Sequence, residues 1–442
     1  MANLTFDLIL RGGVVVNQDG IAPRDIGIRG GTIAAIGDLS LASAGETIDC
    51  AGLHVLPGVI DSQVHFREPG PTHKEDLETG SRAAVLGGVT AVFEMPNTNP
   101  LTTGEPELAD KVARAKNRMH CDFAFWVGGT HDNVKDIPDL ERLPGAAGVK
   151  VFMGSSTGSL LVEDDDGVAR ILGATRRRAA FHSEDEYRLN ERKDLRVAGD
   201  PTSHHVWRDV TAALQCTQRL VRIAREKRAI IHVLHVSTAE EIEFLAGHKD
   251  VASVEVTPHH LTLSSDDYAR LGTKLQMNPP VREPRHRARI WRGVAEGVAD
   301  ILGSDHAPHT LEEKAKPYPA SPSGMTGVQT LVPCMLDHVA AGRLTLERFV
   351  DMTSAGPARL FGIARKGRVA VGYDADFTIV DLKRRETIRD SWIASRAGWT
   401  PYDGKVVTGW AVGTIVRGAK VMWEGDLTTP SRGAPVRFHA SL

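Results

Sequence analysis

Two patterns of apolar and polar positions divide the chain. Residues 5–50, 367–382 and 411–426 hold short alternating segments interrupted by glycines, such as DLILRGGVVV and DIGIRGGTIAAIGD. Alternation with a period of two between glycine breaks is typical of hairpins in a small β-sheet. Because this texture occurs near both ends, we predict one small β-domain that both termini build together.

The middle of the chain repeats a strand, a loop and a helix. Its strand candidates are the apolar runs 54–65, 88–96, 122–129, 148–154, 179–185, 229–237, 251–260 and 298–308. Helix-like segments such as KEDLETGSRAAVLG follow most of these runs. Eight such units predict an α/β fold, a (β/α)8 TIM-type barrel, joined to a small composite β-sandwich. We expect residues 1–53 and 364–442 to form the small β-domain and its tail, and residues 54–363 to form the barrel.

Polar residues collect where these apolar runs end. The first run ends in DSQVHFREPG, and later ones end in or carry MPNTNP, VKVFMG, FHSED, LHVST, TPHH and GSDHAPH. Alternate residues of a strand share a face, so Asp61, Gln63 and His65 point the same way. The C-terminal ends of the strands hold the active site of such a barrel. The pattern therefore predicts a metal pocket at that end.

Composition narrows the class of protein. With 442 residues, 41% apolar and 25% charged, the chain is typical of a soluble globular protein, and its formal net charge of −3 provides no basic field for nucleic acid. Neither a signal peptide nor eighteen consecutive apolar residues occur, so we expect a cytoplasmic protein without membrane contact. The four cysteines are far apart, which argues against a disulfide framework.

Lys150 lies inside the apolar run VKVFMG. A buried ammonium without a partner is costly, so such a lysine tends to lose its proton. The neutral amine can react with carbon dioxide, and the resulting carbamate has two oxygens that can bridge two divalent ions. The alternative is a lysine that extends to solvent at the end of its strand.

Arg67 follows the possible ligand His65 by two positions. Its guanidinium offers a planar fork of donors that suits a substrate carboxylate. The alternative is a surface arginine in a loop.

Seven motifs in the same order resemble those of dihydroorotase, in the cyclic-amidohydrolase branch of the amidohydrolase superfamily. They are DSQVHFREPG, GGVTAVFEMPNTNP, GVKVFMGSSTG, FHSED, LHVST, MNPPVR and GSDHAPH, and the resemblance covers essentially the whole chain. It implies a metal-dependent enzyme of de novo pyrimidine biosynthesis. The implied reaction is the reversible hydrolysis of the cyclic amide of dihydroorotate to N-carbamoyl-L-aspartate.

The resemblance also implies the site residues. The implied metal ligands are His65, Lys150 in its carboxylated form, His182, His235 and Asp305. Nitrogen and oxygen donors without thiolate suit one or two Zn²⁺ ions, although Mn²⁺ or Co²⁺ fits the same set. Asp305 would also take the proton of the attacking water and return it to the departing amide nitrogen.

For the small-molecule substrate, the resemblance implies contacts from Arg67, Asn97, Asn278 and His309. Dihydroorotate carries a ring carboxylate that neutral dihydropyrimidines lack, so its site needs a cation. Allantoinase-like sequences carry NEPG where this chain has REPG. Arg67 therefore favours dihydroorotase.

Two residues depart from the family pattern. Glutamine stands at position 63, where the family usually has a histidine ligand, and Gln329 stands where glutamate is expected. An amide binds zinc more weakly than imidazole, so Gln63 leaves open how many metals are bound. Two alternatives follow. One is an allantoinase-like or hydantoinase-like enzyme, and the other is a non-catalytic dihydroorotase-like subunit of an aspartate carbamoyltransferase complex. The family implies a homodimer and allows that association.

Overall fold

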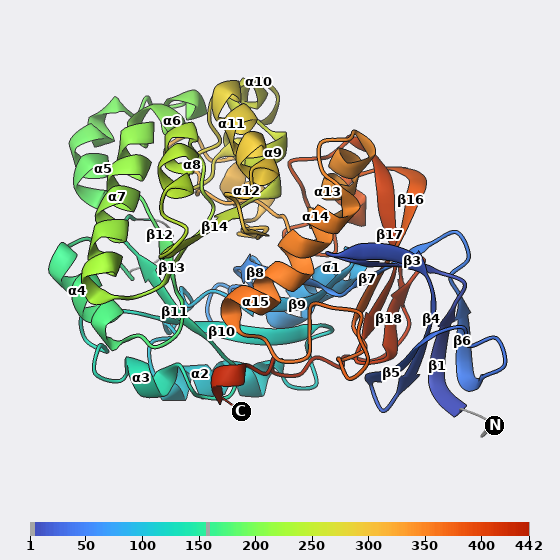
Figure 1. Cartoon of the computed structure of the whole chain (residues 1–442). Coiled ribbons are helices and arrows are strands. Elements are labelled where there is room, and N and C mark those ends of the chain that lie inside the picture. Colours follow the sequence, from blue (N-terminus) through green and yellow to red (C-terminus); the bar gives the residue numbers. More distant parts are fainter. Residues whose placement is uncertain (1–4, 156–159, 442) are drawn as a thin grey trace.

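The structure is a computed structural model in which residues 5–155 and 160–441 are described. Its centre is a sheet of eight parallel strands that runs in chain order (Figure 1). The strands are β8 (Val59–Val64), β9 (Val89–Glu94), β10 (Asp122–Gly128), β11 (Ala146–Phe152), β12 (Ala179–His182), β13 (Ile231–Val233), β14 (Ala252–Val256) and β15 (Ile301–Leu302). The barrel closes where the amide of His65 donates to the carbonyl oxygen of His306 at 2.7 Å. The predicted barrel is confirmed.

The barrel strands are buried along their whole length. All residues of β8, β9, β10 and β11 are buried, which explains why these runs are largely apolar and do not alternate with a period of two. Helices cover the outside, with α4, α5, α7 and α8 grouped on one flank in Figure 1.

The α-helices differ in how they begin, and several have a side chain that caps the first turn. They are α1 (Leu77–Leu86), α2 (Glu105–Ala115), α3 (Ile137–Leu140), α4 (Asp165–Ala174), α5 (Glu186–Arg192), α6 (His204–Trp207), α7 (Val210–Lys227), α8 (Ala239–Ala246), α9 (Pro258–Thr262), α10 (Tyr268–Leu271), α11 (Pro284–Ala295), α12 (Leu311–Lys314), α13 (Leu331–Ala340), α14 (Leu346–Val350) and α15 (Gly356–Phe361). The side chains of Asp76 and Asp209 accept hydrogen bonds from the first turns of α1 and α7.

Two further sheets form the small β-domain. One has the order β5-β4-β1-β6 and the other the order β19-β18-β17-β16-β7-β2-β3. Their strands are β1 (Thr5–Arg11), β2 (Val14–Asn17), β3 (Gly20–Pro23), β4 (Asp25–Arg29), β5 (Thr32–Gly37), β6 (Ser43–Asp49), β7 (His54–Pro57), β16 (Phe377–Thr387), β17 (Val406–Val416), β18 (Ala419–Trp423) and β19 (Asp426–Leu427). The seven-stranded sheet joins both ends of the chain, as the repeated texture predicts.

The first predicted strand, 54–65, is two strands with different partners. β7 pairs with β16 and β2 in the small domain, whereas β8 pairs with β9 in the barrel. Gly58 separates them, and a Cβ there would lie 2.2 Å from Oγ1 of Thr90 and 2.9 Å from Cβ of Asp376. Only glycine lets the chain cross between the two domains so closely. The domain limits at residues 54 and 364 stay a prediction.

Several later runs are shorter strands than predicted. The runs 179–185 and 229–237 contribute only Ala179–His182 and Ile231–Val233. The run 251–260 ends as a strand at Val256, because Thr257 caps α9 and Pro258 begins it. His259 and His260 therefore lie on a short helix. The run 298–308 contributes only Ile301–Leu302 to the barrel.

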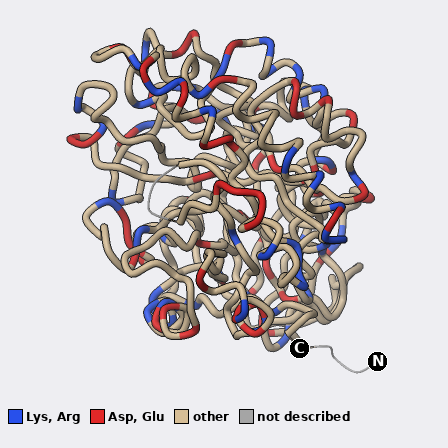
Figure 2. The backbone as a smooth tube through the Cα atoms, turned by 90° about the vertical axis from the view of Figure 1, so that its left-hand side faces the viewer, with Lys and Arg blue, Asp and Glu red and all other residues tan. Residues whose placement is uncertain are grey.

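Figure 2 shows Lys and Arg interspersed with Asp and Glu along the chain. This agrees with the near-neutral net charge of −3. Within residues 5–155 and 160–441, no helix has the length and apolar character that crossing a membrane requires.

Candidate active site

A small cavity lies at the C-terminal ends of the barrel strands. We call it the central cavity; its lining residues are Gln63, His65, Lys150, Phe152, His182, His235, Met277, Asn278, Asp305, Ala307, Ser323 and Gly324. Its volume of about 20 Å³ has room for about one water molecule. The structure thus brings together all six residues predicted as metal ligands, and Asn278 beside them. Their roles as ligands stay a prediction.

One side of the central cavity consists of Gln63, His65 and Asp305, and we call it the glutamine side. Nδ1 of His65 lies 2.8 Å from Oδ1 of Asn97, so this nitrogen carries the proton and Nε2 presents a lone pair. Nε2 lies 3.3 Å from Oδ1 of Asp305, to which the amide of Gln63 donates at 3.1 Å. Burial would raise the pKa of Asp305, but the neighbouring rings of His65 and His235 outweigh it and hold that pKa below its usual range.

The opposite side consists of Lys150, His182 and His235, and we call it the lysine side. Nε2 of His182 lies 2.9 Å from Glu184, and Arg208 in turn donates to Glu184 at 3.2 Å. This carboxylate fixes the His182 tautomer, which leaves a lone pair on Nδ1, 3.0 Å from Nε2 of His235. Burial would raise the pKa of Glu184, but the charge of Arg208 and the His182 contact hold it below its usual range.

Lys150 is buried, with 1% of its surface exposed. Within the described residues its Nζ has no hydrogen-bond partner, and it lies 4.4 Å from the centre of the Phe152 ring. Burial lowers the pKa of Lys150 to about 7, although the charges of Asp305 and Glu255 oppose that shift. A large share of this amine is therefore neutral near pH 7, and the alternative of a lysine that reaches solvent does not match its burial.

These donors fit a divalent cation. On the glutamine side, a lone pair of His65 and a carboxylate oxygen of Asp305 face each other at 3.3 Å. Nδ1 of His235 and Oε1 of Gln63 are buried and have no partner among the described residues. Imidazole nitrogens and carboxylate oxygens are ligands that zinc, manganese and cobalt accept. A bound cation would satisfy acceptors that otherwise repel one another.

Arg67 and His309 lie beside the central cavity but do not line it. The backbone of Arg67 is left-handed, with φ 63°, and its Nε donates to the carbonyl of Pro308 at 3.3 Å. Nε2 of His309 donates to the carbonyl of Ser323 at 3.0 Å and lies 3.4 Å from Nη2 of Arg67. Burial lowers the pKa of Arg67 to about 10, so the guanidinium is charged at neutral pH. Asn97 contacts His65 instead of lining the cavity.

Several residues that shape the site escaped the sequence-based prediction. Glu184 stands two positions after His182 in FHSED, which was an available signal, whereas Arg208 is 24 residues further on and gave none. Glu255, the lone acidic residue in ASVEV, is fully buried and accepts from Ser62 at 3.1 Å. Burial raises the pKa of Glu255 to about 8, so it is largely protonated at neutral pH.

Gln329 lies outside the central cavity and forms hydrogen bonds with the loop that contains Trp392 and Ala394. Its amide nitrogen donates to the carbonyl of Trp392 at 2.7 Å, and its amide oxygen accepts from the backbone of Ala394 at 2.8 Å. A glutamate would supply only acceptors at this place. Gln329 therefore supplies one donor and one acceptor to this loop, whereas a glutamate could not supply the donor.

Residues 310–324, which we call the covering segment, lie against the mouth of the cavity. Ser323 and Gly324 line it, while Nζ of Lys314 donates to the carbonyls of Pro322 and Gln276 at 2.8 Å and 3.3 Å. The indole of Trp207 donates to the hydroxyl of Tyr318 at 2.7 Å. The covering segment is thus packed down over the site, and its response to substrate stays a prediction.

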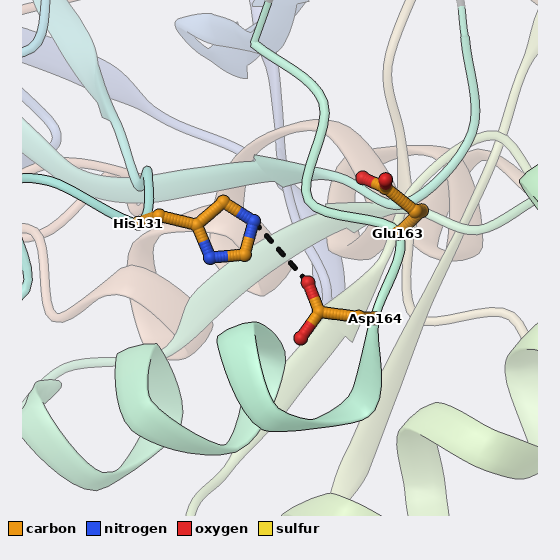
Figure 3. A group of neighbouring side chains, drawn as sticks. All are labelled: His131, Glu163 and Asp164. Carbon is orange, nitrogen blue, oxygen red and sulfur yellow. Dashed lines mark ion pairs between the residues drawn. The ribbon is translucent and has the colours of Figure 1, made fainter.

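A second group of possible metal ligands, His131, Glu163 and Asp164, lies nearer the surface (Figure 3). Its ligand atoms lie within 4.8 Å of one another, and Nε2 of His131 is 3.2 Å from Asp164. Asp164 also caps α4, and a guanidinium nitrogen of Arg170 lies 3.2 Å from Nδ1 of His131. Part of this group is therefore committed to local contacts, and it was not predicted from the sequence.

The model of the amidohydrolase family matches residues 54–421, which include every residue that lines the central cavity. The chain belongs to this family. The family is generally metal-dependent, in agreement with the donor set described above. The match also confirms the family resemblance seen in the motifs.

Similar proteins match this chain over nearly its whole length. A dihydroorotase of Methanosarcina mazei is 36% identical over 97% of both chains, and an allantoinase of Deinococcus radiodurans is 33% identical over 98% of this chain and 99% of its own. A solved L-hydantoinase (dihydropyrimidinase) from Arthrobacter aurescens superposes with a TM-score of 0.94 at 32% identity, over 98% of this chain and 99% of that one. These matches support a cyclic amide hydrolase and confirm the prediction of an enzyme.

Proposed function

We propose that this protein is a dihydroorotase that catalyses the reversible hydrolysis of dihydroorotate to N-carbamoyl-L-aspartate. The observation that carries the proposal is the unpartnered, buried amine of Lys150 among three histidines and an aspartate in one cavity, with the buried cation Arg67 beside it. Several dihydroorotases among the relatives, at 35–38% identity, support this choice of substrate.

The residues that would hold the metal are His65, His182, His235, Asp305 and Lys150, with Gln63 as a weaker sixth donor. Lys150 would add carbon dioxide: the amine lone pair forms a new N–C bond, one C=O π pair moves to oxygen, and a proton leaves the nitrogen. The product is a carbamate with two oxygen ligands. Zn²⁺, when bound, polarises a carbonyl and lowers the pKa of bound water to about 7.

Asp305 is the proton carrier in this proposal. Its low pKa keeps the carboxylate ionised and ready to accept the proton of the attacking water. In hydrolysis it then delivers this proton to the amide nitrogen as the ring opens. Ring closure uses the same groups in the opposite order.

Substrate recognition rests on Arg67, Asn97, Asn278 and His309 in this proposal. Arg67 is buried to 4% exposure, and only Asn278 of this set already lines the central cavity. A cavity of about 20 Å³ is smaller than a six-membered ring, so we expect the residues at its mouth to move apart to admit substrate. The covering segment borders that mouth and would then close again over the bound ring.

A direct assay tests the proposal. The purified protein is given dihydroorotate, N-carbamoyl-L-aspartate, allantoin and hydantoin in parallel, with metal content measured on the same sample. We expect turnover of the first two compounds at least tenfold above the others. Turnover of none, in a sample loaded with metal, would instead support the non-catalytic subunit.

One observation favours a second candidate, a hydantoinase-like or allantoinase-like enzyme. The groups that line the cavity beside the ligand set include Phe152, Met277 and Ala307, and they do not include Arg67. Such a wall suits an uncharged cyclic ureide. Preference for hydantoin or allantoin in the same assay would establish this alternative.

A small-molecule substrate is consistent with the family. A homodimer, an association with aspartate carbamoyltransferase and a cytoplasmic location stay predictions. Light scattering of the pure protein, alone and with a carbamoyltransferase, tests the first two.

A further inference from the structure

A chain of hydrogen bonds connects the covering segment with the central cavity. It runs from Trp207 through Tyr318 and His204 to Asn278, and Tyr318 and His204 are each only 2% exposed. We propose that His204 is a positioning residue that turns the amide of Asn278 so that Nδ2 faces the cavity as a donor for a substrate carboxylate. The identity of that carboxylate rests on the proposed function.

The tautomer of His204 follows from an acceptor that cannot change its role. Nε2 lies 2.9 Å from the main-chain oxygen of Met277, and a carbonyl oxygen only accepts, so Nε2 carries the proton. Burial, together with the charge of Arg208, lowers the pKa of His204 to about 3. The ring is therefore neutral and has a single N–H.

The same N–H fixes the orientation of Asn278. Nε2 of His204 lies 2.9 Å from Oδ1 of Asn278. The reversed amide would set two donors against each other at that distance, so the oxygen must face His204. Asn278 lines the central cavity, and its Oδ1 is the atom that accepts from His204. Its amino group is the part left for a ligand.

The other ring nitrogen continues the chain toward the covering segment. Nδ1 of His204 presents a lone pair, 3.4 Å from the hydroxyl of Tyr318. The indole of Trp207 can only donate, and it donates to that hydroxyl oxygen at 2.7 Å. The Tyr318 proton is therefore free to point at Nδ1. Every donor in the chain points the same way, from Trp207 to Asn278.

The direction of these hydrogen bonds affects which substrates the site prefers. A carboxylate only accepts hydrogen bonds, so an amino group aimed at it is favourable and an amide oxygen is repulsive. A ring without a carboxylate gains much less from the same orientation. His204 should therefore affect discrimination between acidic and neutral rings more than it affects the chemistry.

Replacement of His204 tests this role. His204→Phe keeps a ring against Trp207 and Tyr318, whose ring centres lie 5.9 and 5.7 Å away, but removes both nitrogens. We expect the KM for dihydroorotate to rise about tenfold, with kcat within about threefold. The KM of dihydrouracil, or its inhibition constant if it is not hydrolysed, should change less than about twofold. His204→Gln restores an N–H toward Asn278 and should recover most of the KM.

Equal changes for the acidic and the neutral ring would overturn the proposal, as would a folded His204→Gln protein as defective as His204→Phe. If His204→Phe does not fold, Asn278→Asp replaces it, since this change keeps an oxygen toward His204 and places a second one toward the cavity. We expect its loss to be at least tenfold greater for dihydroorotate than for dihydrouracil. Equal losses would again overturn the proposal.

Failure of the proposed function would be recognised separately. If the unaltered enzyme hydrolyses hydantoins and not dihydroorotate, the proposed substrate is wrong, whereas the role of His204 remains testable. The matched pair is then 5-carboxymethylhydantoin and 5-methylhydantoin, which differ in the carboxylate. A selective effect of His204→Phe on the acidic member would support the inference, and an equal effect would overturn it.

Discussion

The lysine side and the glutamine side of the central cavity are held in place by different means. His182 is oriented by the carboxylate of Glu184, which is fixed in turn by Arg208. His65 is oriented by the neutral amide of Asn97, and its neighbour Gln63 is an amide as well. A carboxylate behind a histidine strengthens that histidine as a ligand, whereas an amide only orients it. We infer that the lysine side binds a metal more tightly than the glutamine side.

Of the changes that test this comparison, removal of Lys150 should have the largest effect on activity. Lys150→Ala deletes the proposed bridging ligand between the two sides, and each ligand to such an ion contributes several kcal/mol. We expect activity to fall roughly a thousandfold, or about 4 kcal/mol, and to recover in part with small carboxylic acids that can replace the bridge.

Lys249→Ala serves as the control, because Lys249 is a partly exposed lysine that pairs with Asp300. It should keep normal activity. A metal-loaded crystal structure in which Lys150 is unmodified and turned to solvent would rule out the bridge.

Exchange of Arg67 should have the next largest effect. Arg67→Lys keeps the charge but loses the planar fork, which should cost about 3 kcal/mol, or roughly a hundredfold in kcat/KM for dihydroorotate. Steady-state kinetics measures this loss, and Arg114→Lys on the exposed face of α2 is the matched control. Near-normal kinetics of Arg67→Lys would show that Arg67 does not bind the carboxylate.

Glu184→Gln probes the lysine side directly. The change removes the charge behind His182, and loss of such a supporting carboxylate typically weakens metal binding roughly tenfold to a hundredfold. Competition with a chelator measures the affinity. The control is Glu141→Gln, a buried glutamate that accepts from the backbone of Arg176 far from the cavity. If both variants release metal equally, Glu184 acts through stability alone.

Gln63→His probes the glutamine side. If this side lacks a strong ligand, the unaltered protein should hold about one metal per chain, and the added imidazole should raise that number toward two. Activity of the unaltered protein should also rise with added zinc or manganese. Elemental analysis gives the metal content, with Gln18→His in the turn between β2 and β3 as the control. Two metals already present in the unaltered protein would show that glutamine suffices.

The smallest expected effect concerns the access of substrate to the two sides of the central cavity. If the covering segment closes over the substrate, a glutamate-specific protease should cut after Glu312 and Glu313 several times more slowly with dihydroorotate present. Cutting after the exposed Glu424, between β18 and β19, provides an internal reference. An unchanged ratio of the two cuts would contradict a lid that responds to substrate.

Much of the fold and of the ligand set could be predicted from local pattern. Apolar runs of strand length predicted the barrel, because strands buried on both faces are mostly apolar. Polar residues at their C-terminal ends predicted a shared pocket, since parallel strands bring those ends together. The family resemblance then pointed to His65, Lys150, His182, His235 and Asp305, and all five line the central cavity. The burial of Lys150 followed from its apolar surroundings alone.

Contacts across long loops were decided only by the tertiary structure. Gln63 meets Asp305 across 242 positions, and Arg208 reaches Glu184 from the segment between β12 and β13. The turn of the chain at Gly58 and the place of Arg67 outside the central cavity were likewise not visible in the sequence pattern. The physical reason is that strand and helix periods report which face is buried, whereas hydrogen-bond partners depend on how the closed barrel places its loops.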